Sequence, residues 1–570
     1  FFQAEDGIRA LIVTGVQTCA LPISEIVVSA VATSDPAFQV QVLSILGRLS
    51  AREATPYLLR PALAADGPTQ VKKVARQALL MIVGALPTQR EAEIYLERRA
   101  RELLADQRAV AHLSQTKTTY WEWDDSNRVA KNRTIDPEQE ALLKARRITR
   151  ELYLLNPNRL LVRNLYWSTA LHAEKTLGGL STPLPKKAGS AFAATAAEGV
   201  STVEEIFEFA LNNEQIAGAI GAVEVLGEIG DASLLETQDG RPGRLTQMLL
   251  HEDRRMRFTA TRAILRLDPQ GPYPGSSYLV DALAYFARTG DMRRILVAHP
   301  RIDKGQFIVG MFRELGFDAD TAQTGNQAIK LAHASPDYQF VLISDAIDQP
   351  AVSELMQHLR RDPRTRNLPL GVMTRQQSAR RMDHLTQTDR LAIAFPRLHS
   401  TEAVRLQTRR LLDLAGRSRL GMDERMMHAE FALQQIARLV SEPETYNFYD
   451  LGRYEAAIRS ALTNSPFTDS AARALGMLAT PDGQRTLIQF ANQSARPLLD
   501  RQSAAKAFAA SVKLRGILLT RREILDQYDR YNESATADVQ TQEVLGSILD
   551  AIEAPTKSKP DADAGVATEE

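Results

Sequence analysis

The 570-residue sequence has almost no cysteine and few aromatic residues: Cys19 is the only cysteine, and Phe, Trp and Tyr make up 6% of the chain. A single cysteine forms neither an intrachain disulfide nor a cysteine-based metal site, so disulfide frameworks and zinc–cysteine modules are excluded. The chain also has no formal net charge, because its 69 Lys and Arg residues are matched by 69 Asp and Glu residues. No overall field therefore favours nucleic acid or an anionic membrane as a partner.

Long apolar runs and common catalytic motifs are missing as well. Nowhere does the sequence approach the roughly 18 consecutive apolar residues of a membrane span. Its 9 histidines include no pair at metal-ligand spacing. There is no glycine-rich phosphate loop, no Gly-x-Ser-x-Gly turn and no His-Glu-x-x-His. We therefore expect no membrane span, no metal, no cofactor and no enzymatic activity.

What is present is the composition of an ordinary globular protein, with 44% hydrophobic and 24% charged residues. Ala and Leu are abundant, and both lead the helix-propensity ranking, so the chain is expected to be largely helical. A chain of this length exceeds what one hydrophobic core supports, which predicts roughly three or four domains.

Residues 1–24 (FFQAEDGIRALIVTGVQTCALPIS) need separate treatment. The stretches QAEDGIR and VTGVQTCALPI resemble the translation of a common sequencing adapter. The alternative is a genuine hydrophobic N-terminus. If the segment is an artefact, the true N-terminus is missing together with any signal peptide, and the remaining chain has no cysteine.

Residues 25–290 are predicted to form a helical-repeat region. In residues 69–80 (TQVKKVARQALL) and 251–267 (HEDRRMRFTATRAILRL) apolar side chains recur at helical spacing, and residues 217–230 form a small-residue helix that ends at a glycine. The pattern of Val, basic residues, then Ala and Leu resembles HEAT-type repeats, which implies a helical solenoid. An irregular helical bundle is the alternative.

Two stretches interrupt this pattern and are expected to be loops. Residues 115–137 are polar but carry Tyr120, Trp121 and Trp123, which either form a docking surface or fold back onto a neighbouring helix as a local anchor. Residues 178–199 are rich in Gly, Pro, Ser and Ala and are expected to be a loop or linker.

A second helical-repeat region is predicted over residues 416–553. Helices are expected within residues 471–478, 486–491 and 503–514, with Pro481-Asp-Gly as a turn between the first two. The tail, residues 554–570, lacks apolar content and is expected to be disordered.

Residues 291–415 show a different periodicity. Five short apolar runs, at residues 295–297, 317–320, 340–343, 370–373 and 391–394, alternate with amphipathic helices. This alternation predicts a doubly wound α/β domain with a five-stranded parallel sheet. The predicted fold class is thus multidomain, with helical repeats flanking one α/β domain, whose working site would lie at the carboxyl ends of its strands.

Three segments of this domain resemble the receiver domain of bacterial response regulators. They are FRELGF (residues 312–317), YQFVLISD (338–345) and LPLGVMT (368–374), in the receiver order and at its spacing. The resemblance covers about a fifth of the chain. It implies phosphoryl transfer from a partner histidine to an aspartate, with Asp345 at the phosphoacceptor position and Thr374 at the hydroxyl position.

The rest of the receiver chemistry has been replaced. His299 and Pro300 occupy the positions of the two acids that would hold Mg²⁺, Phe395 stands where the lysine would be, and Ala392 where the reporting aromatic would be. A hard Mg²⁺ ion requires carboxylate oxygens, which neither His299 nor Pro300 offers.

Losing both metal and lysine removes the charge stabilisation on which phosphoryl transfer depends. Asp345, Asp303 and Asp348 are expected to remain nearby without a cation to balance them, while Arg375, Arg380 and Arg381 are expected to form a solvated helix face.

We therefore expect a non-catalytic regulatory or scaffold protein that uses a pseudo-receiver and HEAT-like repeats to bind protein partners. One alternative is a signalling receiver phosphorylated on Asp345, and another is a fragment of an enzyme whose catalytic domain is missing. A nucleic-acid-binding output is disfavoured, because residues 416–458 show no concentrated basic helix. The receiver likeness implies a bacterial, cytoplasmic setting.

Overall fold

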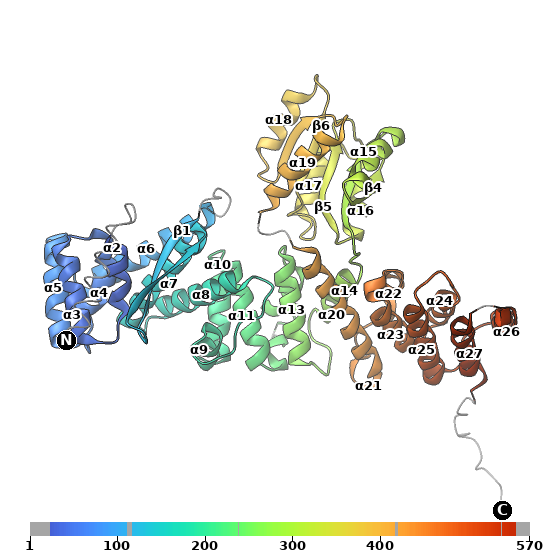
Figure 1. Ribbon diagram of the computed structural model, residues 1–570, viewed down its shortest axis with the longest axis horizontal. Coiled ribbons are helices and arrows are strands. Elements are labelled where there is room, and N and C mark those ends of the chain that lie inside the picture. The colour runs from blue at the N-terminus through green and yellow to red at the C-terminus, as the bar shows by residue number, and fades with distance from the viewer. Residues whose placement is uncertain (1–22, 111–116, 237–238, 417–419, 537, 555–570) are drawn as a thin grey trace, which may run out of the picture. The chain divides into compact units, whose positions relative to one another are not determined.

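The computed structural model describes residues 23–110, 117–236, 239–416, 420–536 and 538–554 (Figure 1). The adapter-like segment therefore lies outside the described residues apart from Ile23 and Ser24, and so do Cys19 and the tail beyond Ala554. The chain forms two compact units, Phe1–Asp231 and Ala232–Glu570, and the division lies inside the helical region predicted for residues 25–290.

The first unit is built from helices that bury one apolar face each. Its helices are α2 (Ile23–Ser29), α3 (Pro36–Arg48), α4 (Thr55–Leu63), α5 (Thr69–Val83), α6 (Gln89–Val110), α7 (Pro137–Leu155), α8 (Leu160–Gly178), α9 (Ala191–Ala197), α10 (Val200–Asn212) and α11 (Ile216–Ile229). Helices close in sequence pack together, for example α3 on α5, α6 on α7, α7 on α8 and α8 on α11. Leu43, Leu79, Leu96 and Leu142 are among the side chains of a shared core that are fully buried. The apolar periodicity of residues 69–80 and 217–230 predicted α5 and α11, whereas most of the other helices were predicted only as part of a helical-repeat region.

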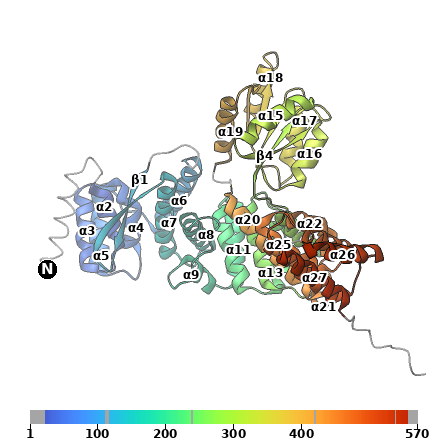
Figure 2. The ribbon, with the colours of Figure 1, turned by 45° about the vertical axis from the view of Figure 1, so that its right-hand side comes forward.

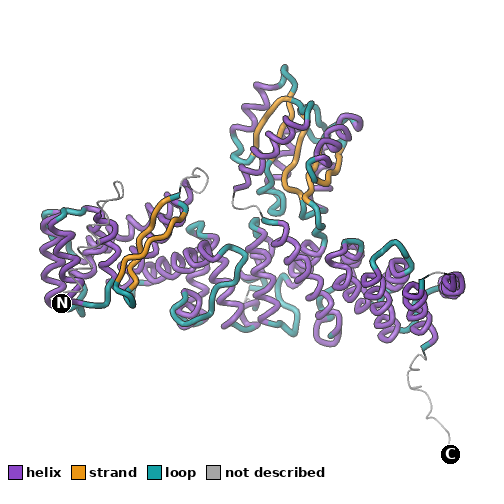
Figure 3. Tube along the Cα trace, viewed as in Figure 1, coloured by secondary structure: helices purple, strands orange, loops and turns teal. Residues whose placement is uncertain are grey.

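The predicted loop at residues 115–137 is largely a β-hairpin, which corrects the sequence prediction. Strand β1 (Thr118–Asp124) pairs antiparallel with β2 (Val129–Ile135) (Figure 3). The sequence shows no clear strand signal here, because most residues of both strands are only half-buried or exposed and no apolar face stands out. Trp123 stacks on Phe38 of α3 with ring centroids 5.1 Å apart, so this aromatic is a local anchor.

The second predicted loop, residues 178–199, contains the short helix α9 and is otherwise irregular. It is held by a buried ion pair between Lys175 and Glu224, and Lys175 Nζ also donates to the main-chain oxygen of Thr182 (2.6 Å). Ser190 caps α9 by accepting a hydrogen bond from the Ala193 N–H (3.1 Å). The segment is therefore ordered both by polar contacts with its neighbours and by the burial of Leu184 and Phe192.

The helical part of the second unit consists of α12 (Arg244–Gln247), α13 (Arg254–Leu267), α14 (Ser276–Ala287), α20 (Met422–Ser441), α21 (Pro443–Tyr446), α22 (Glu455–Leu462), α23 (Thr468–Leu478), α24 (Pro481–Ala491), α25 (Leu498–Arg515), α26 (Arg521–Glu533) and α27 (Val539–Glu553). Pro481 begins α24 rather than forming a turn, because Thr480 caps the helix and proline is favoured in its first turn. Among the helices that the structure describes, none combines the length and apolarity of a membrane crossing.

An α/β domain interrupts this helical array between α14 and α20. Helix α14 packs directly on α20, which packs on α23, and the series continues through α25 to α27. His428 of α20 stacks on Phe258 of α13 with ring centroids 3.7 Å apart. The two helical segments that flank the α/β domain in sequence are therefore continuous with each other in space.

The α/β domain alternates strands and helices in the predicted order: β3 (Arg293–Ala298), α15 (Ile302–Glu314), β4 (Phe317–Ala322), α16 (Gly325–Ala334), β5 (Tyr338–Ser344), α17 (Val352–Arg361), β6 (Leu370–Thr374), α18 (Ala379–Gln387), β7 (Ala392–Pro396) and α19 (Thr401–Ala415). All five strands are parallel in the order β4-β3-β5-β6-β7. This is the doubly wound order of flavodoxin-like and receiver-like domains. The predicted fold class is confirmed.

Both faces of the sheet are covered by helices (Figure 2). One face packs against α16, α17 and α18 through residues such as Ala328 and Leu355, and the other packs against α15 and α19 through residues such as Phe312 and Val404. Because both faces are buried, the strands are continuous apolar runs rather than alternating ones. The domain core leaves only the two ends of the sheet open to polar chemistry.

Candidate functional site

The first candidate site lies at the carboxyl end of the sheet, where the central strands β5 and β6 stop side by side. Asp345 directly follows β5, and its N–H continues the ladder by donating to the main-chain oxygen of Met373 (2.9 Å). Thr374 ends β6, while His299 and Pro300 follow β3. The sequence prediction that Asp345 follows the third strand and Thr374 closes the fourth agrees with the strand bounds.

The Asp345 carboxylate is hydrogen-bonded by its own chain, mainly through one of its two oxygens. Its Oδ2 accepts from the Arg375 N–H (2.9 Å), from Arg375 Nε (3.1 Å) and from the Ser378 hydroxyl. Its Oδ1 lies 3.5 Å from Arg397 Nη2. The side chain of Asp345 is 0% exposed, whereas those of Arg375 and Arg397 are 51% and 39% exposed. A buried carboxylate therefore sits beneath two half-exposed guanidinium groups.

These contacts determine the charge state of Asp345. Burial opposes ionisation, but the hydrogen bonds from Ser378 and Arg375 outweigh it, so the pKa of Asp345 is lowered from its ordinary value. The expectation that no cation balances this carboxylate was wrong, and so was the assignment of Arg375 to a solvated helix face. Arg375 and Arg397 place positive charge beside the Asp345 carboxylate.

The remaining sequence-predicted positions do not converge on Asp345. The hydroxyl of Thr374 donates to the main-chain oxygen of Phe395 (3.3 Å). Phe395 itself is buried in the sheet core with Met373 and Leu342. Ala392 opens β7 and pairs with Leu370, so it lies at the opposite end of the strand from Asp345.

His299 is a turn residue in this arrangement. Its Nδ1 accepts a hydrogen bond from the Arg301 N–H (3.1 Å), and burial is the main cause that lowers its pKa. Asp303 is exposed and paired with Arg301 (2.8 Å), and Asp348 is also exposed. Among the described residues, no three His, Cys, Asp or Glu side chains are placed to hold a metal ion.

The donor set therefore does not suit Mg²⁺. At the two positions where a receiver has its metal-binding acids, this chain has His299, whose Nδ1 already accepts a hydrogen bond, and Pro300. The oxygens of Asp345 are also hydrogen-bonded. Sequence reasoning missed Ser378 and Arg397. Their signal was positional: each follows a strand end within four residues, at the edge where parallel strands converge.

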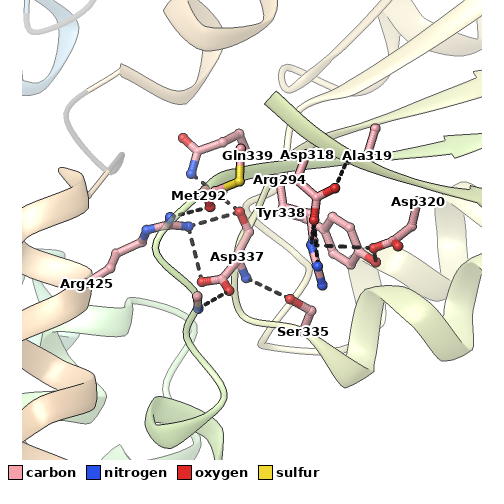
Figure 4. A network of polar contacts seen from close by, with 11 residues as sticks. Met292, Arg294, Asp318, Ala319, Asp320, Ser335, Asp337, Tyr338, Gln339 and Arg425 are labelled. Carbon is pink, nitrogen blue, oxygen red and sulfur yellow. Dashed lines mark hydrogen bonds and ion pairs between the residues drawn. The ribbon is translucent and has the colours of Figure 1, made fainter. Parts of the chain in front are cut away.

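A second polar cluster lies at the opposite, amino end of the sheet, where the α/β domain meets the helical array (Figure 4). Arg425 of α20 donates to the main-chain oxygen of Asp337 (2.9 Å) and lies 3.4 Å from its carboxylate, and both side chains are 4% exposed. The carboxylate of Asp337 also accepts from the Gly290 N–H (2.6 Å).

Beside this pair, Arg294 of β3 bonds Asp318 of β4 (2.6 Å), and the Tyr338 hydroxyl donates to Asp320 (2.6 Å). The polar residues at this end of the sheet fix the domain to α20 and tie β3, β4 and β5 together.

Comparison with known proteins adds no family assignment. A scan against the models of known protein families finds no match to this chain, and a search of the curated proteins finds none either.

Proposed function

We propose that this chain is a non-catalytic regulatory or scaffold protein, in which a pseudo-receiver domain and a HEAT-like helical array bind protein partners. The observation that carries the proposal is the set of contacts that Arg375, Ser378 and Arg397 make to the Asp345 carboxylate. Phosphoryl transfer needs a free carboxylate oxygen as nucleophile and a metal to stabilise the developing charge.

The sequence likeness to receivers and the strand order support the pseudo-receiver part of the proposal. The stacking of α20, α23, α25 and α27 supports the HEAT-like part, because each pair leaves an apolar face for the next. We further propose that residues 1–24 are adapter-derived. The receiver likeness also favours a bacterial, cytoplasmic protein.

A working receiver is the second candidate, and the position of Asp345 directly after the central strand β5 favours it. In that case a phosphodonor would have to displace the arginines, and the metal would need ligands other than His299 and Pro300. This candidate predicts Mg²⁺-dependent phosphorylation, which the first excludes.

Exposure of the full chain to acetyl phosphate and Mg²⁺ discriminates between the two. Borohydride trapping and peptide mass spectrometry would locate any phosphoaspartate, with an active receiver domain in the same tube as reagent control. We expect no modification at Asp345. Mg²⁺-dependent labelling that disappears in Asp345→Asn would overturn the proposal.

A further inference from the structure

Buried arginines gather where the α/β domain meets the helical array. Arg254, Arg255 and Arg257 of α13 and Arg425 of α20 are 7%, 7%, 4% and 3% exposed, respectively. Arg255 forms a bidentate ion pair with Glu424 (2.7 and 2.9 Å), and Arg425 lies beside Asp337.

Arg254 and Arg257 form no such pair within the described ranges. The charge of Asp337 nevertheless acts on Arg254, and the Tyr285 ring lies 5.5 and 4.9 Å from the two guanidinium groups. Neither forms an ion pair with a carboxylate in the part of the chain that the structure describes, and the Nε of each lacks a hydrogen-bond acceptor there. Their remaining contacts are to neutral groups. Arg254 donates to the Pro336 main-chain oxygen (3.2 Å) and the Thr289 hydroxyl (2.9 Å), and Arg257 donates to the His251 main-chain oxygen (2.6 Å). Buried charges in proteins are normally paired, so this absence needs an explanation.

Both arginines line one cavity of about 110 Å³, together with Arg425, Tyr285 and Tyr338. The acidic residues on its wall are engaged elsewhere. Asp253 caps α13 by accepting from the Arg255 N–H (2.7 Å), and Glu252 pairs with Arg366 (2.9 Å). The cavity therefore combines room for a small ion with two arginines that form no ion pair in the described chain.

Two groups beside the cavity have shifted pKa values. Burial lowers the pKa of Arg254 to about 10. His428 lies beside the cluster, and burial together with Arg254, Arg255, Arg257 and Arg262 lowers its pKa to about 2. Burial is the larger cause in both cases, and the neighbouring arginines add to it at His428.

We propose that this cavity binds a small tetrahedral oxyanion, phosphate or its equivalent, held by Arg254 and Arg257. A guanidinium group offers paired N–H donors in a geometry that suits a phosphate oxygen edge. The cavity is lined by the α/β domain, by α13 and α14 and by α20, so the bound ion would bridge the domain and the helical array. This inference is independent of the proposed function, because it does not involve Asp345.

Titration of the full chain with inorganic phosphate, at ionic strength held constant with chloride, tests the proposal. Isothermal calorimetry should show saturable one-site binding, and phosphate should raise the melting temperature. Arg254→Lys and Arg257→Lys each keep a charge but lose the Nε–H, and each should weaken phosphate binding by about tenfold or more. Arg266→Gln, an exposed change on the same helix, should leave phosphate binding unchanged.

Circular dichroism would establish that each variant is folded. If one lysine variant does not fold, phosphate binding by the other tests the proposal. Glycerol 3-phosphate as a second probe distinguishes the source: tighter binding than inorganic phosphate would assign the site to a phosphomonoester, and weaker binding to the free ion. Phosphate binding that does not saturate, or that is equal in the parent chain and the folded lysine variants, would overturn the inference.

Discussion

At the scale of single residues, Asp345 shows how one side chain can keep its place while its surroundings change its role. It follows the central strand as a receiver aspartate would, but Arg375, Ser378 and Arg397 surround its carboxylate. Hydrogen bonds to a charged group are among the stronger ones in proteins. The residue is better placed to tie the β6–α18 connection to the sheet than to accept a phosphoryl group.

Asp345→Asn should therefore destabilise the protein without any phosphodonor present. Loss of the charge-assisted hydrogen bonds should lower the free energy of unfolding of the α/β domain by about 1–3 kcal/mol. Urea unfolding monitored by circular dichroism measures it. Asp303→Asn is the matched control, because Asp303 is exposed and pairs only with neighbouring Arg301, and it should leave the unfolding midpoint nearly unchanged. Equal midpoints for both variants would contradict this structural role.

His428 predicts a pH dependence with a defined sign. Its pKa is about 2 in the folded protein because of burial and four nearby arginines, against about 6.5 when unfolded. Below pH 6.5 the unfolded state therefore binds a proton that the folded state does not, so stability falls as pH falls. From pH 7 to pH 5 this histidine should account for about 2 kcal/mol of lost stability.

Replacement of this histidine should remove that part of the pH dependence. In His428→Leu, the drop in melting temperature between pH 7 and pH 5 should be smaller than in the parent chain. The exposed His384→Leu should retain the full drop. If His428→Leu retained it too, the positive field around α20 would be wrongly described.

At the scale of helices and strands, the sequence predicted the elements whose apolar pattern is strong. All five strands of the α/β domain agree with the predicted segments and alternate with helices as expected, and residues 69–80 and 251–267 lie mainly in α5 and α13. The hairpin was missed because neither β1 nor β2 buries a continuous apolar face. Pro481 was misread because proline favours the first turn of a helix as much as a turn between helices.

The polar contacts of the candidate site could be predicted only in part. Strand order places Asp345 and Thr374 at one edge, because parallel strands share their carboxyl ends. At the end of β7, Phe395 is buried in the core while Arg397 contacts Asp345. These side-chain orientations cannot be predicted from the spacing of residues along the sequence. The buried arginine cluster was also missed, since its members lie 171 residues apart (254 and 425) and meet only through the packing of α13 and α14 with α20.

Gly476 of α23 permits one of the close helix contacts in the array. A Cβ at this position would lie 2.6 Å from the main-chain oxygen of Ala507 in α25. Gly476→Ala should therefore lower the free energy of unfolding by about 1–3 kcal/mol despite the better helix propensity of alanine.

Gly310→Ala is the matched control within α15, because a Cβ there meets no atom within 4 Å. It should be neutral or stabilising by up to about 1 kcal/mol. Thermal unfolding of both variants measures the difference. If the two substitutions shifted the melting temperature alike, the close approach of α23 and α25 would be refuted.

At the scale of the whole second unit, the α/β domain is inserted between α14 and α20 of a helical array, and these two helices pack directly on each other. Its position is fixed by few side chains, chiefly the buried pair of Arg425 and Asp337 and the hydrogen bonds from Arg254. Removal of one member of a buried pair leaves an uncompensated charge, which typically costs about 3–5 kcal/mol.

Arg425→Ala should therefore release the α/β domain from the array while the sheet itself stays folded. Limited proteolysis should cut faster near residues 288–292 in the variant than in the parent chain. Arg366→Ala removes a more exposed contact across the same junction, with side chains 48% and 38% exposed, and should change the rate little. Unchanged cleavage in Arg425→Ala would show that the buried pair does not hold the domain.

Mg²⁺ binding is the sharpest test of the proposal that Arg375, Ser378 and Arg397 stand in place of a metal at Asp345. Calorimetric titration of the full chain with Mg²⁺ at neutral pH, beside Asp345→Asn, should give the same result for both proteins. We expect no saturable Mg²⁺ binding that depends on Asp345. Saturable binding in the parent chain that is lost in Asp345→Asn would contradict it and restore the phosphorylation switch.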